Sequence, residues 1–235
     1  MENLTTQRNE ITNKPQTLSD PWLETLKKSD LGDLLVDLFD SGLDAITNNV
    51  FIQRIPILKS VVTVFKLGNS VRERAHLKKL EVFIYEINSG AVDEKKKEQY
   101  LDRMSKNKRA AERELEYILM LLDRMIAEEK AQFLARLYIA YINEDIDWNM
   151  FCQLSEIIDR FLPGDTECMN NSILKNSNRS EIENCAIQRL QSMGIVRQNA
   201  RASVFDVSGN PVSTMSDGTY ELTIIGDLLK RTIFV

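Results

Sequence analysis

Few of the 235 residues are of the types that carry enzyme chemistry. The single histidine, His76, lies in a strongly charged segment, where a solvated or boundary side chain is more common than a catalytic base. Cys152, Cys168 and Cys185 lack the paired spacing and the histidines of a zinc site, and no glycine-rich phosphate loop occurs. We therefore predict a protein that is not an enzyme and that binds no cofactor.

Four aspartates near the N-terminus have a spacing that suits a metal ion. Asp33, Asp37, Asp40 and Asp44 recur every three or four residues, which places them on one face of a helix. Carboxylate oxygens are the ligands that Mg²⁺ and Ca²⁺ prefer. No second acidic helix is expected to show a matching inward motif of the Glu-x-x-His type that metal sites in helical bundles use. The pattern therefore favours a solvated acidic face, with a metal site as the weaker alternative.

Positively charged residues gather in two segments that are candidates for contacting a partner. Residues 51–110 carry 14 lysines and arginines against 7 aspartates and glutamates, although the whole chain has a net charge of −5. Such charge blocks steer a partner or face an acidic helix of the same bundle. Helical spacing places the first group mostly outward. The candidates are Arg72, Arg74, Lys78 and Lys79 in this segment and Arg189, Arg197 and Arg201 nearer the C-terminus.

The spacing of apolar residues predicts that these side chains stand on a mainly α-helical scaffold. Residues 1–18 are polar and aperiodic, and we expect a flexible tail there. Residues 20–163 show apolar residues at three- and four-residue intervals, which predicts a helical bundle. The first helix should begin at Asp20 and Pro21, because aspartate caps free amides and proline suits the first helical position.

Helix boundaries inside the bundle follow from capping and breaking residues. A helix should run from Ser70 to about Ile87, with Asn-Ser-Gly ending it. Residues 91–162 contain neither glycine nor proline, so three or four helices are expected in that stretch. One should begin after Asp93 and one at Asp147, since each aspartate can cap the amides that follow it.

The pattern changes in the C-terminal third. Residues 164–179 are rich in Asn, Ser and Asp and are typical of a linker. Residues 180–235 then read as helix, strand, hairpin, strand and helix, with a capping box at Ser180 and Glu183, a turn at Gly209 and a cap at Thr223. This order predicts a small winged-helix-like α+β module after the N-terminal bundle.

Location and membrane contact follow from the same residues. Unpaired cysteines and the polar start of the chain favour the cytoplasm. The apolar-rich segment 50–67 is interrupted by Arg54, Pro56, Lys59 and Lys66, so we expect no transmembrane helix. An amphipathic contact of this segment with a membrane surface stays an alternative.

Three stretches together resemble a widespread family of uncharacterised helical bacterial proteins, reminiscent of abortive-infection proteins that accompany phage-defence genes. They are IPILKSVVTVFKLGNSVRERAHLKKLEVFI, LLDRMIAEEKAQFLARLYIAYINEDIDWNMFCQLSEIIDRF, and LQSMGIV followed by YELTIIGDLL. The resemblance covers roughly residues 30–235. It implies a cytosolic protein of bacterial or phage origin with a C-terminal winged helix, and it carries no catalytic motif to transfer.

We therefore predict a non-enzymatic protein-interaction or sensor module in bacterial antiviral defence, whose partner is another protein or a second copy of the chain. One alternative is a winged-helix regulator that binds DNA. Glu181, Glu183, Asp206 and Asp217 nearly cancel the cations of the C-terminal module, which weakens that alternative. The other alternative is a membrane-acting effector that uses residues 50–67.

Overall fold

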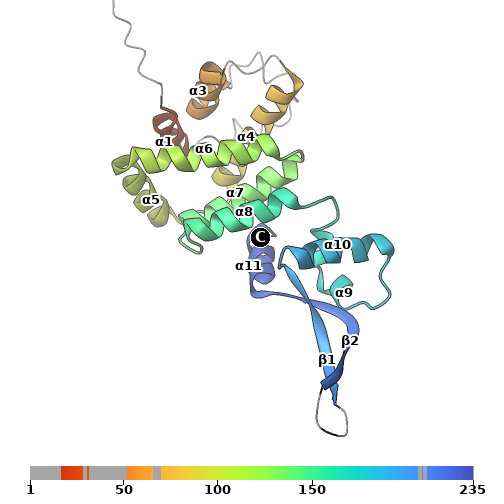
Figure 1. Ribbon diagram of the computed structural model, residues 1–235. Coiled ribbons are helices and arrows are strands. Elements are labelled where there is room, and N and C mark those ends of the chain that lie inside the picture. Colours follow the sequence, from red (N-terminus) through yellow and green to blue (C-terminus); the bar gives the residue numbers. More distant parts are fainter. Residues whose placement is uncertain are drawn as a thin grey trace, which may run out of the picture.

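The computed structural model describes residues 17–28, 31, 52–65, 70–205, 208 and 211–234, without the side chains of residues 200–205 and 211–217. Its described part is mainly helical, with one small antiparallel sheet near the C-terminus. The helices stack into an elongated body, and the sheet leaves the body at one end (Figure 1). The predicted tail and the four aspartates Asp33, Asp37, Asp40 and Asp44 lie outside the described residues, apart from Thr17 and Leu18.

Seven α-helices and a short 3₁₀ helix form the body among the described residues. They are α1 (Ser19–Lys27), η1 (Ile52–Arg54), α3 (Pro56–Phe65), α4 (Val71–Ser89), α5 (Glu94–Lys106), α6 (Lys108–Arg124), α7 (Glu128–Ile142) and α8 (Trp148–Arg160). Helix α7 packs against both α4 and α8, and ten of its fifteen residues are buried. It is therefore the central helix of the body.

Several helix starts match the sequence prediction because one side chain satisfies the free amides. Asp93 accepts a hydrogen bond from the Lys96 amide at the start of α5, and Asp147 accepts one from the Met150 amide at the start of α8. Ser70 forms a capping box that the sequence prediction did not include. These local contacts fix where the helices begin without help from distant residues.

The start of α1 differs from the prediction. Asp20 does not cap this helix; its carboxylate lies 2.8 Å from the Lys108 ammonium instead. The amides of Leu18 and Ser19 donate to the two carboxylate oxygens of Glu112 in α6, at 3.1 and 2.9 Å. A carboxylate from a distant helix thus caps α1, and local sequence rules cannot reveal such a contact.

Aromatic side chains fill the middle of the body. The rings of Trp22, Phe83 and Tyr138 lie with centroids 5.8 to 6.1 Å apart, and all three side chains are fully buried. Tyr100 and Tyr141 continue this cluster toward α5 and α8. Large rings bury much apolar surface, so this cluster stabilises the packing of α1, α4, α5 and α7.

A single carboxylate lies inside this aromatic cluster. Glu114 of α6 is 6% exposed and accepts hydrogen bonds from the hydroxyls of Tyr100 and Tyr141 at 2.8 Å each, and from Tyr138 at 3.4 Å. Burial raises the pKa of Glu114, and the tyrosine hydrogen bonds oppose that rise. Glu114 shares the inward face of α6 with Ala111, Leu115 and Ile118, where water is excluded. Its carboxylate oxygens therefore take the place of water as hydrogen-bond acceptors for the three tyrosine hydroxyls.

The C-terminal third contains more regular structure than predicted. The segment expected as a linker holds η2 (Glu167–Met169) and α9 (Asn171–Leu174), followed by α10 (Glu181–Ser192). Four short strands were expected, whereas the chain forms two long strands, β1 (Val196–Phe205) and β2 (Pro211–Leu222), before α11 (Ile224–Ile233). The capping box at Ser180 and the cap at Thr223 are confirmed.

Replacement of Glu114 by alanine tests the buried network. The hydroxyls of Tyr100 and Tyr138 also bond each other, so the change leaves two buried hydroxyls, that of Tyr141 and one of this pair, without an acceptor, at about 1–3 kcal/mol for each unsatisfied group. We expect the melting temperature to fall by at least about 4 °C, measured by circular dichroism at 222 nm, since each kcal/mol shifts Tm by roughly 2–4 °C in a chain of this size. Glu114→Gln keeps one acceptor oxygen and should lower Tm less.

Glu116→Ala is the matched control, because Glu116 is an exposed glutamate of the same helix. It should change stability by no more than about 0.5 kcal/mol. Equal melting temperatures for the Glu114 and Glu116 variants would contradict the structural role of the network.

Candidate interaction surface

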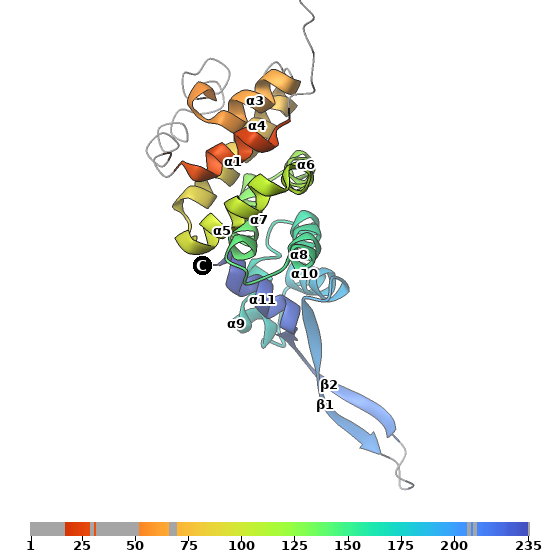
Figure 2. The ribbon, with the colours of Figure 1, turned by 90° about the vertical axis from the view of Figure 1, so that its left-hand side faces the viewer.

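The two-stranded hairpin β1–β2 projects away from the helical body (Figure 2). Its strands pair in antiparallel register, with Val196 opposite Leu222 at the base and Phe205 opposite Pro211 near the tip. No third strand joins this sheet among the described residues. A two-stranded hairpin is only marginally stable in water by itself, so the base must be held firmly by the body.

One arginine fixes the base of the hairpin from the side of β2. Arg179, which follows α9, donates to the carbonyl of Gly218 in β2. Its guanidinium also lies 4.9 Å from the ring centroid of Tyr220, within the range of a cation–π contact. Gly218 has a φ of +73°, a left-handed conformation that glycine adopts without strain. Arg179 thus covers the outer edge of β2 at its base.

Helix α11 holds the base from the other side. A Cβ at Gly226 would lie 2.0 Å from the carbonyl oxygen of Ile195, so only glycine permits this approach of α11 to the start of β1. The Thr223 hydroxyl bonds the carbonyl of Gly194 at 2.6 Å. Phe234 packs edge-to-face on Phe133 of α7, which joins α11 to the body.

Arg189, predicted to contact a partner, pairs with a buried aspartate of its own chain. Its guanidinium lies 2.5 Å from the carboxylate of Asp165, which is completely buried. Asp165 also accepts a hydrogen bond from the Leu162 amide at 2.9 Å. The pair joins α10 to the end of α8, and the ionic hydrogen bond offsets the cost of burying the carboxylate.

The other candidate cations of this module are also engaged or lie outside the described side chains. The Arg197 guanidinium lies 2.7 Å from Glu221, which is opposite it in the strand register. The side chain of Arg201 lies outside the part of the chain that the structure describes. Arg179, Arg189 and Arg197 therefore all bind acceptors of their own chain, which reduces their availability for phosphate groups.

The candidate cations of α4 are less exposed than predicted. The expectation of an outward position is wrong for Lys78 and Lys79, which are only 6% and 5% exposed. Lys79 donates to the carbonyl of Met125, and Lys78 lies 3.2 Å from Glu81. Arg72 is exposed as predicted and pairs with Asp123 of α6. Basic α4 thus faces acidic groups of its own bundle.

The Lys78–Glu81 pair has an unusual electrostatic environment. Glu81 is 1% exposed, and one of its carboxylate oxygens has no hydrogen-bond partner among the described residues. Burial raises the pKa of Glu81 from 4.5 to about 7, although Lys78 opposes this rise. Glu81 therefore changes its protonation state near neutral pH.

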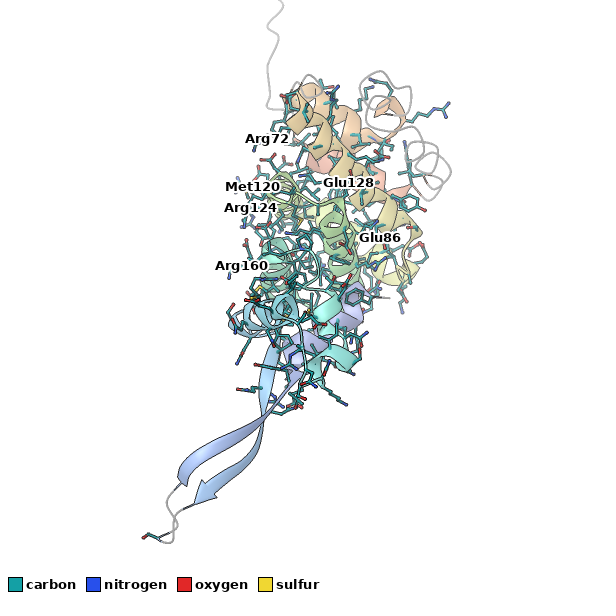
Figure 3. All side chains as sticks on the ribbon, turned by 90° about the vertical axis from the view of Figure 1, so that its right-hand side faces the viewer. Arg72, Glu86, Met120, Arg124, Glu128 and Arg160 are labelled. Atoms are coloured by element: carbon teal, nitrogen blue, oxygen red, sulfur yellow. The ribbon has the colours of Figure 1, made fainter. Side chains whose placement is uncertain are left out.

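One side of the body carries a row of charged side chains around a methionine. Figure 3 shows Arg72, Met120, Arg124 and Arg160 along this side, from α4, α6 and α8. Arg124 pairs with Glu156 at 3.1 Å and with Asp159. Met120 is 59% exposed. Arg72 and Arg124 on this side therefore pair with neighbouring carboxylates of the chain.

Metal-binding groups do not gather among the described residues. His76 is partly buried, and its Nδ1 has no hydrogen-bond partner there. No set of three His, Cys, Asp or Glu side chains in these ranges is close enough to hold a metal ion. The Glu114 carboxylate is engaged by the hydroxyls of its own tyrosines.

A surface pocket of about 590 Å³ lies between α4, α7 and α11. Arg136 lines it, with Nε 2.6 Å from Glu86 and a second nitrogen bonded to the carbonyl of Ile233. Ile139 and Leu228 provide apolar walls. Because Arg136 of α7 bonds both Glu86 of α4 and the Ile233 carbonyl of α11, it joins α11 to the body.

Comparisons with known proteins give no relative. No family model, no curated protein sequence and no solved structure matches the chain significantly. Within the ranges that the structure describes, no helix combines the length and apolar character that crossing a bilayer requires.

Sequence reasoning missed the residues that hold the hairpin. Arg179 and Tyr220 are 41 positions apart and interact only through the fold. Glu114 had a visible signal, since it is a lone carboxylate on an otherwise apolar helical face. Ile182 gives a misleading signal, because its spacing suits the buried stripe of Ala186 and Leu190 in α10, yet its side chain is 80% exposed.

The raised pKa of Glu81 predicts a pH-dependent stability. A folded-state pKa near 7 against an ordinary value of 4.5 means that Glu81 favours folding below about pH 4.5 and that this contribution declines as pH rises to about 7. The loss is up to about 3 kcal/mol. The Glu81→Gln variant should lose this dependence, measured by urea unfolding at pH 4.5 to 7.5. The same change in unfolding free energy with pH in both proteins would contradict this role of Glu81.

Replacement of Arg189 by alanine should destabilise the C-terminal module. It leaves the buried Asp165 carboxylate without its cation, at a cost of about 3 kcal/mol. We expect faster amide hydrogen exchange in α10 and β1, with little change in α4 and α7. Arg160→Ala, on the exposed side of α8, is the control and should leave exchange unchanged. Unaltered exchange in the Arg189 variant would refute this role.

Proposed function

We propose that the chain is a non-enzymatic protein-interaction module, with a helical body that presents the β1–β2 hairpin as a contact arm, in a bacterial antiviral system. In this proposal the C-terminal module is a winged-helix-like unit whose wing is elongated. The proposal depends on one observation above all, the projection of the hairpin beyond the helices of the body. The antiviral setting rests on the resemblance of the sequence alone.

The composition of the arm supports contact with protein rather than with nucleic acid. The distal residues 200–205 and 211–216 contain one charged residue, Arg201. Phosphate neutralisation provides nearly all non-specific nucleic-acid affinity, so a distal segment with one cation has little to offer a duplex. Backbone groups on strand edges can instead pair with a strand of a partner.

Site-specific crosslinking tests whether the arm contacts protein. A photoreactive amino acid at Ser208, in the turn between β1 and β2, should form protein crosslinks in bacteria that express the chain with its neighbouring genes. The same amino acid at Gln153, an exposed position of α8, is the control and should crosslink much less. Crosslinks from Ser208 to nucleic acid alone would contradict the proposal.

A shortened arm tests the role in defence. Residues 201–215 are replaced by Asn-Gly, which joins Ala200 to its partner Ser216 through a two-residue turn. The contacts of Arg179 and Gly226 at the base remain, so the circular dichroism spectrum of the helices should be unchanged. We expect loss of protection in phage plating assays, and retained protection would count against the arm.

A further inference from the structure

The outer edge of β2 divides into a covered base and an open distal segment. Arg179 occupies the edge carbonyl at Gly218. The helices that pack on β2 are α9 and α11, both at the base, and Figures 1 and 2 show the distal hairpin clear of the body. Beyond Gly218, residues 211–217 therefore have a pairing partner on one side only, β1, among the described residues.

The open segment lacks the charged side chains that often prevent strand edges from pairing, although it begins with Pro211. Natural edges carry charged residues, most often lysine. Residues 211–216, PVSTMS, carry no charge, although charged residues make up 28% of the chain. The matching part of β1, residues 200–205, carries one charged residue, Arg201. The β2 edge is therefore the one suited to receive another strand.

The strand register gives this segment a natural centre. Ala202, Ser203 and Val204 pair regularly with Met215, Thr214 and Ser213, and register shifts flank this stretch on both sides. The regular ladder is centred on Thr214. When the segment is laid antiparallel on a copy of itself about that residue, Ser213 faces Met215 and Pro211 faces Asp217. No two like charges meet, so the edge is compatible with itself.

From this geometry we infer that the arm pairs with the arm of a second copy of the chain. The β2 segments of the two copies lie antiparallel about a two-fold axis near Thr214, which turns two marginal hairpins into one four-stranded sheet. This inference rests on the proposed function of the arm and names its partner. The two helical bodies lie at opposite ends of the joint sheet.

The size of the contact sets its strength. A pairing of seven residues spans about 23 Å, and such an edge contact falls short of the roughly 1,200 Å² that stable complexes bury. The dimer is therefore weak and reversible. Each copy carries a net charge of −5, so added salt should leave the association unchanged or strengthen it, opposite to its effect on nucleic-acid binding.

Sedimentation equilibrium of the full chain between about 5 and about 500 μM tests the inference, since that range brackets weak association. The expected result is a concentration-dependent dimer. The variants Thr214→Lys and Thr214→Glu should each weaken it, because like charges meet at the two-fold axis. An equal mixture of the two variants should associate about tenfold more tightly than either alone, because opposite charges then meet.

The mixture distinguishes an effect on pairing from an effect on folding. Any loss of stability that a Thr214 variant suffers is present both when it is alone and when it is mixed, so only pairing can differ between the two samples. Ser203→Lys and Ser203→Glu, directly across the ladder on β1, are the matched controls, and mixing them should restore nothing. A chain that stays monomeric over the whole range, a Thr214 mixture no tighter than its components, or restoration by the Ser203 mixture would each overturn the inference.

Failure of the inference can be told apart from failure of the proposed function. If the chain is monomeric but position Ser208 still crosslinks to another protein, the contact arm stands as proposed. Only the inference that its partner is a second copy then fails. If the chain forms the dimer but arm shortening does not reduce defence, the proposed function fails and the inferred pairing stands.

Discussion

The body of this protein is organised around a carboxylate placed where water cannot reach it. Glu114 would be costly to bury alone, and the hydroxyls of Tyr100, Tyr138 and Tyr141 offset that cost only if α5, α6 and α7 meet at one relative position. An apolar core tolerates small sliding of its helices, whereas directional hydrogen bonds do not. The network therefore selects one packing arrangement for the helices that carry the hairpin.

Charged side chains also link helices to one another elsewhere in the chain. Ion pairs join segments that are distant in sequence, as Arg72 joins Asp123, Lys96 joins Glu144 and Lys108 joins Asp20. The division of the sequence into basic and acidic blocks thus reflects, in the described residues, helices that neutralise each other. A charged block in a sequence is therefore insufficient evidence for an anionic partner.

The helical class, most helix starts and the position of the C-terminal hairpin could be predicted from the sequence, because periodicity and capping are local. The buried lysines of α4 could not, since a long side chain facing a distant carbonyl leaves no local signal. The same holds for the cap that Glu112 provides to α1. Alternation predicted four short strands where two long ones form, because Gly218 resembled a turn and lies inside β2.

The length of the hairpin has a mechanical consequence. Ten residues of β1 extend about 33 Å at the usual rise per residue, whereas the base is held by a few contacts around Arg179 and Gly226. A tilt of about 10° at that base would displace the tip by about 6 Å over this length. A small tilt at the base would therefore displace the tip much further than the base itself.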